Sequence, residues 1–80
     1  MDERRTALGK DDAKGAQDAA DLLALALENV GFDVGRDFPS LSSGAGLGDV
    51  GFVELGRVSG GVAFDLAIVL TAAVGRGVTL

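Results

Sequence analysis

The sequence predicts an α+β domain, in which one N-terminal amphipathic helix packs on a small antiparallel sheet. Three observations lead to this prediction. Apolar residues recur at spacings of three and four between residues 12 and 30, and Gly31 then ends that segment. Two apolar segments, about residues 50–58 and 62–71, flank a Gly-Gly pair. No internal repeat is visible, and 80 residues suffice for one domain.

The predicted helix spans about residues 12–30. Its apolar face carries Ala16, Ala20, Leu23, Leu27 and Val30. Asp11 and Asp12 supply side-chain oxygens that suit an N-cap. Gly31 can adopt the left-handed conformation of a C-terminal cap, and Phe32 follows where the accompanying hydrophobic contact is expected.

The apolar segment after residue 59 has two interpretations. In the favoured one, Gly60-Gly61 is the turn of a β-hairpin that pairs residues 50–58 with 62–71. This register sets Val53 opposite Ile68 and Phe52 opposite Val69. In the alternative, Ser59 caps a C-terminal helix of about residues 60–74, which gives an α-β-β-α order. That helix is apolar nearly all round and begins with two glycines, which are poor helix formers.

The remaining segments carry weaker signals. Residues 1–10 read as a mobile N-terminal tail, or as an arm that orders against a partner, and residues 11–80 as a single domain. Residues 32–34 suggest a short strand, and Pro39 marks a turn or a sheet edge. Residues 42–48 suggest a flexible loop. Residues 71–80 suggest a further short strand after a turn at 75–77.

The composition excludes most side-chain chemistry. The chain has no Cys and no His, which removes disulfides, thiolate metal sites and the usual proton carrier near neutral pH. Ser40, Ser42 and Ser43 therefore have no histidine to activate them. We expect a protein that is not an enzyme and has no cofactor and no metal.

Two motifs invite a functional interpretation, and each has a simpler explanation. Residues 46–51 match the G-x-G-x-x-G pattern of dinucleotide sites, but the residues after them resemble a strand rather than a helix. Asp33 with Asp37, and Asp18 with Asp21, could hold a hard cation, but neither pair has the spacing of an EF-hand loop. We interpret the first as an ordinary loop and the acidic pairs as solvated side chains.

The charge distribution limits the kinds of partner that the protein is expected to bind. The net charge is -5, and residues 15–56 carry seven acidic side chains and one basic one, Arg36. A basic stripe of the kind that binds nucleic acid is absent, so direct nucleic-acid binding is not expected. The longest apolar run, residues 62–74, is too short to span a bilayer and contains Asp65. We expect a soluble, cytoplasmic protein with no membrane partner and no small-molecule substrate.

The favoured hairpin predicts an interface. Both faces of the hairpin are apolar, and one helix can cover only one of them. The other face carries the candidate interface residues Val50, Phe52, Val58, Val69 and Asp65. We therefore expect self-association, or a protein partner that covers this face.

The leading hypothesis is a non-enzymatic, self-associating assembly subunit. The Ala-, Gly-, Asp- and Val-rich composition suits a GC-rich bacterium or its phages. A helix followed by strands is also a layout of small phage neck and tail components, which makes a virion a second possible location. The alternative is a small acidic inhibitor or regulator that binds a basic surface on a target protein.

Overall fold

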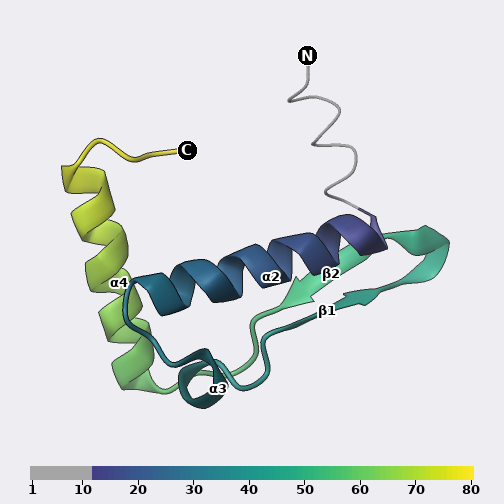
Figure 1. Cartoon of the computed structure of the whole chain (residues 1–80), viewed down its shortest axis with the longest axis horizontal. Coiled ribbons are helices and arrows are strands. Elements are labelled where there is room, and N and C mark those ends of the chain that lie inside the picture. The colour runs from purple at the N-terminus through teal and green to yellow at the C-terminus, as the bar shows by residue number, and fades with distance from the viewer. Residues whose placement is uncertain (1–11) are drawn as a thin grey trace.

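The computed structural model describes residues 12–80, so the predicted tail at 1–10 and the proposed cap Asp11 lie outside the described residues. The elements are α2 (Ala13–Asn29), α3 (Val34–Asp37), β1 (Ser42–Ala45), a 3-10 turn η1 (Leu47–Asp49), β2 (Gly51–Glu54) and α4 (Gly60–Gly75). Helix α2 lies along the two-stranded antiparallel sheet, and α4 stands at the end of α2 (Figure 1). The α+β class, with a long helix on a small antiparallel sheet, is confirmed.

Helix α2 forms as its sequence predicts. The side chain of Asp12 accepts a hydrogen bond from the backbone N–H of Gly15 at 2.7 Å, which satisfies one of the free donors of the first turn. At the other end Gly31 has φ +115°, a conformation that side chains with a Cβ rarely adopt. Phe32 then donates its N–H to the carbonyl of Leu27 at 3.0 Å, which closes the helix with a Schellman motif.

The predicted pairing of residues 50–58 with 62–71 is wrong. Strand β2 pairs instead with β1, with Gly44 opposite Phe52 and Ala45 opposite Gly51. Residues 62–71 lie in α4, as the alternative interpretation had it. The side chain of Ser59 accepts the N–H of Val62 at 3.1 Å and so caps this helix.

The prediction was wrong because an unbroken apolar run is compatible with the periodicity of a helix as well as with that of a strand. Residues 60–75 are too many for an ordinary strand, which spans four to eight residues, and they have a helix cap at one end. Gly60 and Gly61 lack the positive φ that a two-residue hairpin turn requires. They form the first turn of α4, where few intrahelical bonds depend on them.

Three shorter predictions are also corrected. Residues 32–34 form no strand, because Val34 begins α3. Residues 42–48, expected as a flexible loop, contain β1 and the start of η1. The expected strand in 71–80 is absent, because α4 continues to Gly75 and closes at Gly77, which has φ +88°. Pro39 lies in a turn after α3, in agreement with one of its two expected settings.

The core is small and lies between α2, the sheet and the segment after α3. Among the described residues, the buried side chains are Ala16, Ala20, Leu27 and Phe38. The rings of Phe32 and Phe38 meet edge to face, with centroids 5.4 Å apart and an interplanar angle of 88°. Three of these four residues belong to α2, and two of the three are alanines. Because alanine side chains are small, the sheet approaches that helix closely.

Candidate interaction surface

Helix α4 has one face toward the domain and a wider face toward solvent. Its half-buried residues recur at helical spacing: Val62, Leu66, Val69 and Ala73. The opposite side, which we call the outer face of α4, is exposed and consists of Phe64, Ala67, Thr71 and Val74, with the exposed Ile68 at its edge beside the hollow next to α2. No side chain of α4 is buried, and its contacts with the other described elements are sparse. An apolar helix therefore stands largely uncovered at the end of the domain (Figure 1).

The exposed apolar side chains of α4 are large. Phe64 is 68% exposed and Ile68 is 54% exposed, and Leu70 and Val74 are exposed as well. The one charged residue between Gly60 and Gly75 is Asp65. Helices that are apolar on every side are usually buried, either in a protein core or in a membrane. Within residues 12–80, no helix combines the length and the apolar character needed to cross a membrane.

The outer face of the sheet has a different apolar group. Phe52 pairs with Gly44 across the strands, and its ring covers that glycine: a Cβ added at Gly44 would lie 2.5 Å from Cζ of Phe52. An aromatic ring over a strand glycine protects backbone that has no side chain of its own. Phe52 remains half exposed, and Val50 beside it is exposed.

The structure divides the predicted interface residues among three places. Phe52 lies in β2 with Val50 directly before it, Asp65 and Val69 lie on α4, and Val58 lies in the segment between β2 and α4. The pairing that would have joined Phe52 to Val69 does not form. Val58 and Val69 are half-buried, and Val50 and Asp65 are exposed. The outer face of α4 was missed because the hairpin was favoured, although the Ser59 cap and the uniform apolar run pointed to it.

A hollow of about 530 Å³ separates α4 from the end of α2. One wall is the turn after α2 together with α3, including Phe32 and Arg36, and the other is the first half of α4, including Asp65 and Val69. Arg36 donates from Nε to Oδ1 of Asp37 at 3.1 Å. Apolar side chains and the charged groups of Arg36, Asp37 and Asp65 therefore line the hollow together.

Asp37 is expected to titrate below its ordinary value. The hydrogen bond from Arg36, and a second from the backbone N–H of Asp33 at 3.0 Å, hold the pKa of Asp37 below 3.8. Since a lowered carboxyl pKa favours the charged form in the folded state, this contribution to stability is present above pH 3.8 and is lost as the pH falls through the lower folded value.

An NMR titration of the Asp37 carboxyl carbon measures this shift. In the variant Arg36→Gln, which removes the larger cause, the pKa of Asp37 should rise toward 3.8. A wild-type pKa at or above 3.8 would contradict the hydrogen bonds described.

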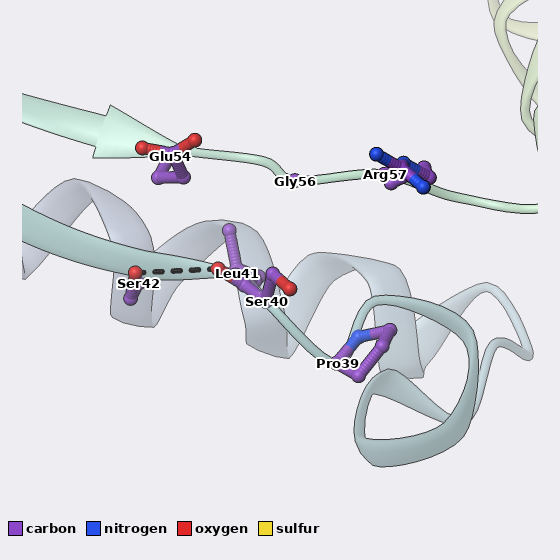
Figure 2. Close-up of a pocket in the computed structure, with 7 residues that line it drawn as sticks. All are labelled: Pro39, Ser40, Leu41, Ser42, Glu54, Gly56 and Arg57. Atoms are coloured by element: carbon purple, nitrogen blue, oxygen red, sulfur yellow. Dashed lines mark hydrogen bonds between the residues drawn. The ribbon is translucent and has the colours of Figure 1, made fainter.

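A second, more open groove lies where residues 39–42 run beside residues 54–57, at the end of the strands toward α3 (Figure 2). Glu54 and Arg57 come from one side, and Pro39, Ser40 and Ser42 from the other. The hydroxyl of Ser42 donates to the carbonyl of Ser40 at 3.2 Å. With no histidine in the chain, neither serine has the base that nucleophilic catalysis usually requires.

The two motifs singled out in the sequence are placed by the structure. Residues 46–50 join β1 to β2 and Gly51 begins β2, so the G-x-G-x-x-G pattern lies in a hairpin connection and not before the helix that binds a pyrophosphate. Asp33 donates its N–H to Asp37, and Asp18 faces Lys14 at 3.4 Å on the exposed side of α2. Over residues 12–80, no group of three or more acidic side chains could hold a metal ion.

Comparisons of the chain with protein-family models, curated proteins and solved structures find no match. The class of protein that the fold defines is a small α+β domain with an uncovered apolar C-terminal helix.

Proposed function

We propose that this protein works by contact, as a non-enzymatic subunit that self-associates through the outer face of α4. The observation that carries the proposal is the exposure of α4: sixteen residues, one charge and no buried side chain. Covering each large apolar side chain stabilises a complex by roughly 1 kcal/mol when about half of its surface is already buried. Phe64, Ile68 and Val74 supply exposed apolar surface of this kind on the outer face.

The small core supports the same proposal. Chains of this length bury too little surface to be very stable, and self-association is one way to add burial. Disulfides cannot do so here because the chain has no Cys. An assembly subunit, in the cytoplasm or in a phage particle, fits these properties. Val50 and Phe52 offer a second contact on the sheet for a larger assembly.

The test is a pair of double variants with matched exposure. Phe64→Asp with Ile68→Asp places two carboxylates on the outer face of α4. Leu22→Asp with Leu25→Asp places the same two carboxylates on α2, where the leucines are 67% and 58% exposed. We expect sedimentation velocity to show concentration-dependent association of the wild type, its loss in the α4 variant, and its retention in the α2 variant.

Two results would count against the proposal. A wild-type chain that stays monomeric at millimolar concentration would remove self-association altogether. Equal association in both double variants would show that the contact lies elsewhere than α4. Binding to a basic target protein that weakens sharply with added salt would instead favour the acidic regulator.

A further inference from the structure

The hollow between α4 and the end of α2 has two walls that complement each other, and we propose that it closes. In the closed arrangement α4 moves toward the turn after α2, and Asp65 forms an ion pair with Arg36. This inference goes beyond the proposed self-association and does not depend on it. The outer face of α4 points away from the hollow, so it stays exposed when the hollow closes.

Helix α4 is loosely attached to the rest of the domain. Among residues 12–80, no hydrogen bond or ion pair joins the part from residue 59 onward to the part before it. No side chain of α4 is buried, and its contacts with the other described elements are sparse. A segment with so few buried contacts can move at a low cost in free energy. Tertiary contacts therefore do not hold α4 in a single position.

The segment between β2 and α4, which has no helix or strand, provides the pivot. Gly56 has φ +75° and lies close to Ser40, since a Cβ added at Gly56 would overlap Cβ of Ser40. The next fixed point is Ser59, which caps α4. Only Arg57 and Val58 lie between these two points, and changes in their backbone angles turn the whole helix.

The residues of α4 that line the hollow form one face of the helix. They recur at helical spacing, with Asp65 in the middle: Gly61, Val62, Asp65, Ile68 and Val69. The facing wall includes Val30 and Phe32, which are apolar. Val30 is 53% exposed and Ile68 is 54% exposed, although both border the same hollow. Closing the hollow removes both side chains from water, which is favourable and needs no second molecule.

The charges on the two walls favour the same movement. Of the described residues that line the hollow, Asp65 is the one charged residue on α4, and Arg36 is the one basic residue on the facing wall. Asp65 takes part in no ion pair within residues 12–80. Arg36 donates from Nε to Asp37 at 3.1 Å, and its other guanidinium N–H groups can donate to Asp65. Asp37 also lines the hollow, and the same guanidinium reduces its repulsion of Asp65.

Closure gives the outer face of α4 a defined direction. While the hollow is open, α4 and its outer face can take several orientations relative to α2 and the sheet. In the closed arrangement the helix takes one of them. A surface that is already fixed before it binds loses less conformational entropy on binding, so closure prepares α4 for contact.

Introduced cysteines detect the closed arrangement, since the chain has none of its own. Val30→Cys with Ile68→Cys places one thiol on each wall, and a disulfide requires their Cβ atoms to approach within about 4.5 Å. Val30→Cys with Ala67→Cys is the matched control, because Ala67 is the neighbour of Ile68 and lies on the outer face. At concentrations where the chain is monomeric, we expect mild oxidation to form the disulfide in the first pair and to leave the second pair reduced. Intact-mass measurement distinguishes the two states.

Charge variants of the first cysteine pair test the ion pair. Asp65→Arg places two cations across the hollow and should slow disulfide formation about fivefold at low salt. Asp65→Arg with Arg36→Asp restores opposite charges and should bring the rate back to within about twofold of the parent pair. Asp21→Arg makes the same change of charge on an exposed residue of α2 that does not line the hollow, and it should leave the rate unchanged.

Spin labels supply a second measurement that leaves both walls intact. Leu22→Cys and Thr71→Cys place the labels on exposed positions of α2 and α4. We expect electron–electron resonance to show two distances between the labels. Asp65→Arg should lower the population of one of them, and the charge swap should restore it.

The outcomes decide closure separately from self-association, which sedimentation tests. A first cysteine pair that stays reduced, equal oxidation of both pairs, or a single distance that the charge variants do not change would overturn closure and leave self-association standing. Selective oxidation of the first pair, slower oxidation in Asp65→Arg and rescue by the swap would establish it.

Discussion

Replacing Phe38 by alanine is expected to lower the free energy of unfolding by about 3–5 kcal/mol. Phe38 is 4% exposed and is the one aromatic ring in the buried core of the described chain. Its removal deletes the edge-to-face contact with Phe32 and leaves a cavity that the short segment around it cannot fill. A domain of this size has roughly 4–12 kcal/mol of stability in total, so a measurable unfolded fraction should appear without denaturant.

Urea unfolding followed by circular dichroism measures this loss. Phe64→Ala is the matched control, because Phe64 is 68% exposed and the same atoms are removed from solvent-facing surface. At concentrations where the chain is monomeric, that control should change the stability by less than about 0.5 kcal/mol. Equal losses in the two variants would mean that Phe38 is not the centre of the core.

The sequence sufficed to predict α2 because its local signals agree with one another. The apolar spacing, the Asp12 cap and Gly31 all specify the same helix, and each acts within a few residues. The overall class followed, since one helix of this length needs a partner surface. Where local signals agree in this way, a single sequence is enough to predict the element.

The pairing of the strands could not be predicted in the same way. Strand β1 is Ser42–Ala45, and its sequence resembles a loop because it has no large apolar side chain. It becomes a strand through Phe52, whose ring lies over Gly44. Gly44 and Phe52 are eight residues apart in the sequence, so the residues of β1 alone do not predict this contact.

The candidate surface depended on the same choice. Phe64, Leu66, Ile68 and Leu70 alternate as in a strand, while the whole run is also compatible with a helix. Once the run is helical, Leu66 faces the domain and Phe64 faces solvent, while the exposed Ile68 borders the hollow beside α2. Asp65 was expected at an interface by way of the hairpin. The structure places it on α4 instead, where it borders the hollow beside α2 and α3.

The second large effect is expected at Gly51, where the sheet approaches α2 most closely. A Cβ at this position would overlap the backbone carbonyl oxygen of Asp12 and lie 2.7 Å from Cβ of Ala16. Backbone cannot move aside as a flexible side chain can, so Gly51→Ala must push β2 away from the first turn of α2. Overpacking of this kind costs about 1–3 kcal/mol, and Gly51→Val should cost more.

Urea unfolding gives the size of the loss at Gly51, and amide hydrogen exchange locates it. Exchange should accelerate first in residues 13–20, because the strain falls on the start of α2 and spares Phe38. Gly60→Ala is the control: its Cβ meets nothing within 4 Å, and the stability should stay the same or rise by up to about 1 kcal/mol. A Gly51→Ala variant as stable as wild type would mean that helix and strand are further apart than the structure places them. The order of the two glycine variants therefore tests directly whether α2 and the sheet form the close layer on which the small core depends.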